Sequence, residues 1–139
     1  MKGKFRPNHP EKYKGDPTNI LYRSSWELKV MSNLDKADNV ETWSSEELSI
    51  PYISPLDGKR HRYFVDFVVK YKDGKTVLIE VKPDKQTRPP EVQTKKSKKY
   101  IKEVMTWAIN SAKWVYAQKY CEKNGYEWKI LTEKELFVK

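Results

Sequence analysis

The sequence predicts a mixed α/β fold in which helices flank a sheet built on a central antiparallel hairpin. Two runs rich in Val, Ile, Phe and Tyr, at 63–71 and 76–82, flank the turn Lys72-Asp73-Gly74-Lys75, which is typical of a β-hairpin. Apolar residues at helical spacing predict one helix before the hairpin and a longer one after it. An alternating segment at 126–130 follows the long helix and can return as a strand parallel to a neighbour.

Length and composition favour one domain spanning 1–139, with 1–19 as an irregular N-terminal arm. Hydrophobic residues make up 37% of the chain and aromatic residues 13%, which is enough for an ordered core. Cys121 is the single cysteine, so no intrachain disulfide can form, and this favours a reducing environment. No apolar run approaches the roughly 20 residues that span a bilayer, so we expect a soluble chain with no membrane partner.

The charge is strongly basic and unevenly distributed. The formal net charge is +9, from 28 basic and 19 acidic residues. Residues 1–23 carry six basic and two acidic side chains, and residues 85–100 carry six and one, whereas 24–84 carry nine and eleven. Basic segments thus flank a slightly acidic centre that contains the hairpin. A polyanion such as nucleic acid is the natural partner of this layout, and solubility alone is the alternative explanation.

A helix is expected over 24–36. Ser24 followed by Glu27 is typical of a capping box at its start. An apolar face then follows at Trp26, Val30 and Leu34. Glu27 has two interpretations: the third residue of the cap, which the sequence favours, or an acid that projects from the helix start toward the hairpin.

Segment 39–52 predicts one or two strands, and Pro51 indicates an edge or a strand end. The longest helix is expected over 97–123, with an apolar stripe that we interpret as core packed against the sheet. The stripe consists of Ile101, Met105, Ala108, Ala112, Val115 and Tyr116, widened by Tyr100, Val104, Trp107 and Trp114. Asn124-Gly125 is typical of a helix end, and the capping box at 132–135 predicts a short C-terminal helical turn.

Three charged residues stand where a sheet normally has apolar ones: Asp66 in the first run, and Glu80 and Lys82 in the second. The period of two places Glu80 and Lys82 on one face. A two-residue turn would set Asp66 opposite Val81, on the other face. A three-residue loop, Lys72-Asp73-Gly74 with its glycine left-handed, sets Asp66 opposite Glu80 instead, with Cβ atoms about 4.5–5.5 Å apart.

Two opposed carboxylates repel each other, and a divalent cation between them removes that repulsion. Hard oxygen ligands on a partly open site suit Mg²⁺, or Mn²⁺ in its place. Lys82 can hold a water or a phosphate oxygen on the same face, and together these groups are the equipment of metal-dependent phosphodiester hydrolysis. The alternative is an exposed charge cluster of Asp66, Glu80 and Lys82 with no metal.

The segment after Lys82 is a loop that runs into a lysine-rich stretch. We expect contacts to the phosphates of double-stranded DNA from its basic residues, Lys85, Arg88, Lys95, Lys96, Lys98 and Lys99. The alternative is a solvated helix N-terminus. Cations at that end oppose the helix dipole, which favours the DNA-binding interpretation.

Asp66 followed by Glu80-Val81-Lys82, after Ser24-x-x-Glu27, resembles the PD-(D/E)XK nuclease superfamily. Within it, the chain is similar to the endonuclease subunit of heteromeric transposases, and more so to the head completion nuclease family of T-even-like tailed phages. The segments that carry this resemblance are YKGDPTNILYRSSWELK, WSSEELSIPYISPLDGK and RYFVDFVVK. Val65 departs from the superfamily motif, which has proline there to shape the strand.

The resemblance implies a restriction-endonuclease-like fold and a Mg²⁺-dependent deoxyribonuclease, cutting as an endonuclease or exonuclease. It further implies action in phage head completion and head–tail joining after DNA packaging, in the host cytoplasm or the virion, with head and neck proteins as partners. By the resemblance, Glu27, Asp66 and Glu80 would be metal ligands, the Val81 carbonyl a further ligand, and Lys82 the catalytic lysine.

Two other functions remain as alternatives. One is a DNA-binding structural protein of the head–tail junction that has lost catalysis. The other is a nucleic-acid-binding module unrelated to phages, which would have no need of an acidic centre facing a polyanion.

Overall fold

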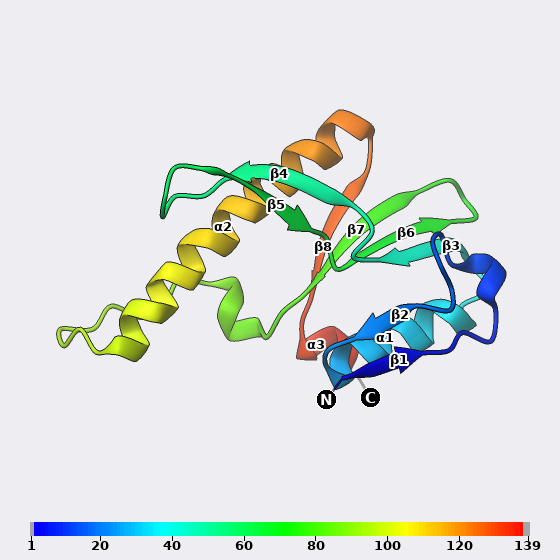
Figure 1. Ribbon diagram of the computed structural model, residues 1–139, viewed down its shortest axis with the longest axis horizontal. Helices are drawn as coiled ribbons and strands as arrows, with labels where there is room; N and C mark the ends of the chain where they lie inside the picture. Colours follow the sequence, from blue (N-terminus) through cyan, green and yellow to red (C-terminus); the bar gives the residue numbers. More distant parts are fainter. Residues whose placement is uncertain (1, 138–139) are drawn as a thin grey trace.

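The computed structural model describes residues 2–137 and shows a mixed sheet with helices on both faces (Figure 1). The central sheet has the strand order β3-β6-β7-β8, and two smaller sheets pair β1 with β2 and β4 with β5. The strands are β1 (Gly3–Phe5), β2 (Ile20–Tyr22), β3 (Val40–Ser45), β4 (Ser49–Ile53), β5 (Arg60–Phe64), β6 (Phe67–Tyr71), β7 (Thr76–Val81) and β8 (Glu127–Leu131). The helices are α1 (Ser25–Lys36), α2 (Lys98–Asn124) and α3 (Glu133–Leu136), with short 3-10 turns η1 (Pro10–Lys12) and η2 (Asp84–Thr87).

The predicted fold class is confirmed. Strands β6 and β7 form the central antiparallel hairpin, and β8 returns from α2 to pair in parallel with β7. Helix α1 begins at the expected cap, where the Ser24 side chain accepts a hydrogen bond from the Glu27 amide at 3.1 Å. The capping box at Thr132 opens α3. Among residues 2–137, no helix is long and apolar enough to cross a membrane.

The two faces of the central sheet belong to different cores. One core joins α1, α3 and the N-terminal strands to the sheet. Its buried residues include Val30, Met31, Leu34, Trp43, Phe67, Val69, Val77 and Ile79. The second core packs α2 and the β4–β5 pair on the opposite face, through Ile50, Tyr52, Tyr63, Val65, Leu78, Ala117 and Cys121. Alternate residues of β7 therefore face α1 and α2, as the pleat requires.

The hairpin has the three-residue loop that the sequence analysis requires. Phe67 lies opposite Ile79 and Lys70 opposite Thr76, a register that pairs residues summing to 146. The Tyr71 amide donates to the Lys75 carbonyl at 2.8 Å and closes the loop. Gly74 has a φ of 94°, where a side chain is unfavourable. This register brings Asp66 and Glu80 to the same face of the sheet.

The first run of the hairpin is two strands, not the single strand expected over 63–71. Strand β5 pairs only with β4, and β6 joins the central sheet, with a bend at Val65 and Asp66 between them. Backbone hydrogen bonds from the end of β3 and the start of β4 hold the bend: the Val65 amide donates to the Leu48 carbonyl, and the Glu46 amide donates to the Asp66 carbonyl. The continuous apolar pattern gives no sign of this change of partner.

The apolar stripe expected along α2 is wrong for its N-terminal half. Ile101, Val104 and Met105 are exposed, at 46%, 40% and 44% of their surface, and Val115 in the C-terminal half is exposed as well. The fully buried face of α2 instead consists of Asn110, Trp114, Ala117 and Cys121. The reason is geometric: the first turns of α2 extend past the central sheet (Figure 1).

The segment 1–19, expected to be an irregular arm, is more ordered than that. It contains β1 and η1, and its residues are fixed to the far end of α1. The Lys12 ammonium donates to the carbonyls of Leu34, Asp35 and Ala37 at 2.7–2.9 Å, and the Asp35 carboxylate accepts from the amides of residues 8 and 9. These bonds satisfy carbonyls that a helix end leaves free.

We predict that Gly74→Ala destabilises the protein by about 1–2 kcal/mol, because a Cβ is strained at positive φ even where space is open. Gly74→Asn should cost about half as much, since asparagine tolerates the left-handed region better. Urea unfolding measures both values. Lys72→Ala, in the same exposed loop, serves as the control and should change stability by less than about 0.5 kcal/mol; an equal loss in all three variants would contradict the role of the backbone at Gly74.

Candidate active site

Asp66 lies at the bend between β5 and β6 and points toward the end of β7. Its Oδ2 atom accepts a hydrogen bond from the Val81 amide at 2.8 Å. Its own carbonyl accepts from Glu46, whose φ of 53° is unusual for a residue with a side chain. The carboxylate is thus held from both ends by backbone, which fixes its position relative to β7.

Glu80 occupies the same face, in the middle of the sheet and beneath α2. Its side chain is buried, with only 4% of the residue exposed. Its Oε2 atom accepts a hydrogen bond from the Trp114 indole Nε1 at 2.9 Å. A carboxylate that is removed from water requires such a donor, because burial without partners is costly.

Asp66 and Glu80 form a close acidic pair, as the three-residue loop predicts. Burial is the largest cause that raises the pKa of Asp66, and a hydrogen bond to the Glu80 carboxyl and the Glu80 charge act in the same direction. Together they bring this pKa to about 9. The Val81 amide opposes these effects by favouring the ionised form. At neutral pH the pair therefore retains a proton when no cation lies between its members.

The donor set of this pair fits a hard divalent cation. The Val81 amide holds one oxygen of Asp66 and the Trp114 indole holds one oxygen of Glu80. The two carboxyls also share a hydrogen bond, which a cation between them would replace. Within residues 2–137, no group of three His, Cys, Asp or Glu side chains is arranged to hold a metal ion. A cation at the pair would complete its shell with backbone carbonyl, water or phosphate oxygens, which is the coordination that Mg²⁺ commonly adopts.

Glu27 lies at the start of α1, and α1 covers the opposite face of the sheet from Asp66 and Glu80. Its charge contributes the smallest of the effects that raise the pKa of Asp66, so it lies within electrostatic range. Its Oε1 atom accepts from the Arg23 amide at 3.0 Å, in keeping with the capping interpretation. The face of the sheet that carries Asp66 and Glu80 is covered by α2 and not by α1. The role of Glu27 as a metal ligand stays a prediction.

Lys82 follows β7 directly and, by the pleat, shares the side of Glu80. Its amide donates to the Leu131 carbonyl at 3.0 Å, which extends the pairing with β8 past the end of the strand. The structure therefore brings Asp66, Glu80 and Lys82 together at one end of the hairpin, with the Val81 backbone between them.

Sequence reasoning missed two α2 side chains at this site. Trp114 was expected only as packing, yet it donates to Glu80. Lys113, next to it, is half-buried over the rings of Tyr52 and Tyr63, at 5.8 and 5.6 Å from their centroids. Burial lowers the pKa of Lys113, while the charges of Glu80 and Asp66 raise it. The sequence carried one signal of their role. Lys113 is a charged residue next to Trp114 on a helix face that was otherwise interpreted as core.

Tyr63 is a further polar group beside the acidic pair. Its hydroxyl is buried with no hydrogen-bond partner among residues 2–137. Burial raises its pKa, and the charges of Glu80 and Asp66 raise it further, so the phenol is neutral and close to both carboxylates. It lies near Glu80 without meeting the geometry of a hydrogen bond.

The basic residues expected to contact DNA lie on the surface, in η2 and around the start of α2. Lys85 is in η2, Lys98 and Lys99 begin α2, and Lys95 and Lys96 precede it, all exposed. Arg88 is exposed but also paired, because its guanidinium donates to the Asp84 carboxylate at 2.9 Å.

A close acidic pair and a lysine at the end of a hairpin in a mixed sheet fit a nuclease, and comparison with known proteins places the chain in that class. Residues 37–133 match the family model described as TnsA-like endonuclease N terminal, and the chain belongs to this family. It is also similar to the head completion nuclease of Enterobacteria phage T4, with 41% identity over 138 residues, covering 96% of this chain and 92% of that protein. The resemblance drawn from the sequence is thereby confirmed.

We predict that the metal-free protein loses stability as the pH rises from about 5 to 9. The folded state holds a proton on Asp66 that the unfolded chain has released, so stability is greatest near the ordinary pKa of 3.8 and falls toward the raised value of about 9. The midpoint temperature should fall by an amount on the order of 5 °C more in the native protein than in Asp66→Asn.

Asparagine keeps the size of Asp66 and its bond to the Val81 amide while removing the charge, so it isolates the titration. Glu41→Gln, an exposed acid paired with Lys70, should retain the native pH dependence. Parallel pH curves for Asp66→Asn and the native chain would contradict the assignment.

Proposed function

We propose that this protein is a Mg²⁺-dependent deoxyribonuclease that hydrolyses phosphodiester bonds at the Asp66–Glu80 pair. The observation that carries the proposal is the acidic pair itself: Glu80 is buried beneath α2, and Asp66 lies half-buried beside it, held by the Val81 amide. Burying two facing carboxylates destabilises the fold unless a proton or a cation lies between them. A site for Mg²⁺, or Mn²⁺ in its place, gives this arrangement a purpose.

Each residue has a distinct role in this proposal. Asp66 and Glu80 hold the cation, which when bound supplies an activated water and offsets charge on the scissile phosphate. The Val81 carbonyl, between them on β7, is a further ligand. The Trp114 indole and the Val81 amide keep the two carboxylates in position beside each other.

Lys82 donates to a non-bridging oxygen of the scissile phosphate or orients the attacking water. A positioned cation stabilises charge best where water is excluded, and Lys82 is partly buried at the end of β7. Lys113 supplies a second positive charge to the same space from α2, which suits the negative charge that builds on the scissile phosphate as water attacks it and the sugar oxygen leaves. Glu27 tunes the site electrostatically from the edge of the sheet or binds a second cation there.

The biological setting is proposed from the similarity to the T4 head completion nuclease. We infer that this chain acts on double-stranded DNA during phage head completion, in the host cytoplasm or in the virion, where head and neck proteins are its partners. Its basic surface, with a net charge of +9, supports a DNA substrate.

The first prediction is that the purified protein cleaves plasmid DNA when Mg²⁺ or Mn²⁺ is present and not when EDTA is present. Asp66→Asn, Glu80→Gln and Lys82→Ala should each lower the cleavage rate by at least about 100-fold, because each removes a group on the cation or the phosphate. Glu41→Gln and Lys70→Ala, an exposed acid and base on β3 and β6, are the matched controls and should retain the native rate.

Cation binding has a separate readout in thermal unfolding. Mn²⁺ should raise the midpoint temperature of the native protein and of Glu41→Gln, and not that of Asp66→Asn. Cleavage that survives in all three site variants would refute the proposal. Retained DNA binding with no cleavage under either metal would favour the non-catalytic structural role.

The second prediction concerns the lysines at the start of α2. Lys98→Ala combined with Lys99→Ala should weaken binding to all DNA sequences alike and reduce the slope of log K against log salt by about 2, since each phosphate contact contributes about 0.9. The matched control is Lys119→Ala with Lys123→Ala, at the other end of the same helix, which should leave the slope unchanged. Equal slopes for the two double variants would exclude α2's N-terminus from the interface.

A further inference from the structure

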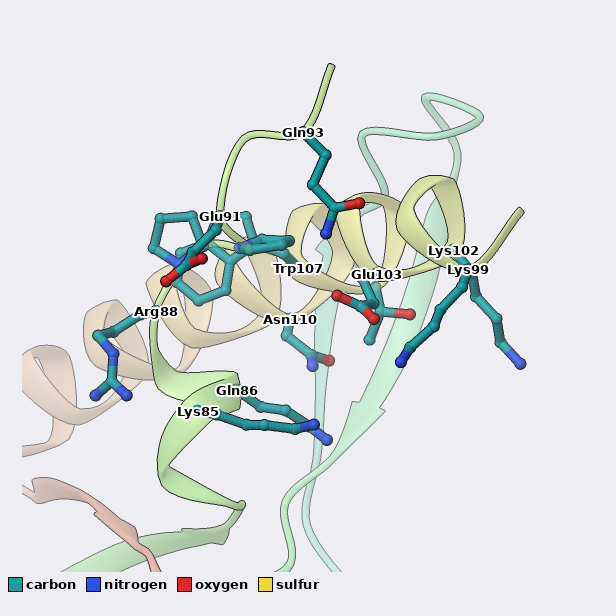
Figure 2. A pocket seen from close by; sticks show the side chains of 13 residues that line it. Lys85, Gln86, Arg88, Glu91, Gln93, Lys99, Lys102, Glu103, Trp107 and Asn110 are labelled. Atoms are coloured by element: carbon teal, nitrogen blue, oxygen red, sulfur yellow. The ribbon is translucent and has the colours of Figure 1, made fainter. Parts of the chain in front are cut away.

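A cavity of about 560 Å³ opens between η2, the following loop and the N-terminal half of α2 (Figure 2). Its volume falls in the range of about 300–1,000 Å³ that is typical of small-ligand sites. The side chains that bear on its chemistry are Lys85, Gln86, Lys99, Lys102, Trp107 and Asn110. The cavity is thus polar at the rim, with cations on both sides, and has an aromatic wall.

The deepest polar group of this cavity is Asn110. The residue is 7% exposed, and no side-chain hydrogen bond among residues 2–137 involves its amide. Figure 2 shows this amide directed away from α2, toward the side of the cavity formed by Lys85 and Gln86. The amide is open to the cavity, so its donor and its acceptor are both available to a ligand there.

The cavity adjoins the acidic pair through α2. Asn110 and Trp114 are one helical turn apart and both lie on the buried face of the helix. The Trp107 ring, on the cavity wall, contacts Trp114 edge to face with centroids 6.0 Å apart, and Trp114 holds Glu80. A ligand in the cavity is therefore within a nucleotide or two of a phosphate placed at Asp66 and Glu80.

We infer that this cavity binds one unpaired nucleotide of the DNA, next to the phosphate that is cleaved. The inference rests on the proposed function and specifies its substrate: DNA with a base that leaves the helix. The Asn110 and Gln86 amides match the alternating donors and acceptors of a base edge, and Trp107 offers an apolar wall for the ring. Lys85, Lys99 and Lys102 face the flanking phosphates.

The charge of the cavity suits this ligand. Four cationic side chains line the cavity, against the two carboxylates of Glu91 and Glu103. The excess positive charge attracts a singly charged phosphodiester, and the two carboxylates can accept hydrogen bonds from a base. A paired base in a duplex would present no free Watson–Crick edge to a cavity of this depth. The same surface therefore distinguishes unpaired from paired nucleotides.

The test measures affinity in EDTA, so that no cleavage occurs, for two short duplexes of equal length. One is fully paired and the other carries a single unpaired 2-aminopurine. The native protein should bind the second about tenfold more tightly, the effect of one well-made base contact. Asn110→Leu should reduce this preference to less than about twofold while changing affinity for the paired duplex little.

Asn110→Leu should leave the midpoint temperature nearly unchanged, because leucine keeps the branched shape of asparagine and the cavity has room for its methyl groups. Gln118→Ala, an exposed amide on α2 outside the cavity, is the matched control and should keep the tenfold preference. Gln86→Ala, an exposed wall residue, gives a second test free of any effect on folding, and it should lower the preference as well.

Equal affinity of the native protein for both duplexes would overturn the inference, as would a preference that survives in Asn110→Leu and Gln86→Ala. These results differ from failure of the proposed function, which would appear as absence of Mg²⁺-dependent plasmid cleavage by the native protein. A protein that cleaves paired plasmid DNA and shows no preference retains the nuclease proposal and loses the unpaired-nucleotide site.

Discussion

The hydrogen bond from the Val81 amide to Asp66 Oδ2 is the contact on which the site depends. It ties the bend before β6 to the end of β7, and it places a carboxylate against Glu80 where like charges repel. Without that donor, Asp66 would lose the one interaction that favours its ionised form. In the free protein a shared proton removes most of the repulsion between the two carboxyls. A divalent cation can replace that proton.

The rest of the fold holds this contact in place. Strand β7 is buried on both faces, with Val77 and Ile79 against α1 and Leu78 against α2, so the hairpin cannot shift register without exposing one core. Its parallel pairing with β8 extends through Val81, which fixes the amide that Asp66 needs. The tight loop at Gly74 sets the register from the other end.

The sequence predicted the parts of the structure that follow from local rules. Caps at Ser24 and Thr132 and the glycine of the hairpin loop are local signals, and each was found where expected. The register of β6 against β7 depends on loop length, which the sequence left open between two and three residues and which the structure shows to be three. The acidic pair was predictable because charged residues within an apolar strand pattern are costly to bury unless they have a partner or a ligand.

Long-range features were not predictable in the same way. The break at Val65 arises because β5 pairs with β4, and nothing in an unbroken apolar run records which partner each residue has. The exposure of Ile101 and Met105 follows from the length of α2 relative to the sheet, which no periodicity contains. The donor from Trp114 to Glu80 joins residues 34 apart, so only the folded chain shows it.

One face of helix α2 both packs in the second core and contacts the acidic pair. Ala117 and Cys121 bury its C-terminal half in the second core, which makes that half rigid. One and two turns earlier, Trp114 and Asn110 are equally buried but polar, one bonded to Glu80 and the other free. The apolar half therefore fixes the position of the polar half, and the acidic pair and the cavity beside it keep a constant separation. A helix that held the two sites more loosely could not couple recognition of a base to the position of its neighbouring phosphate.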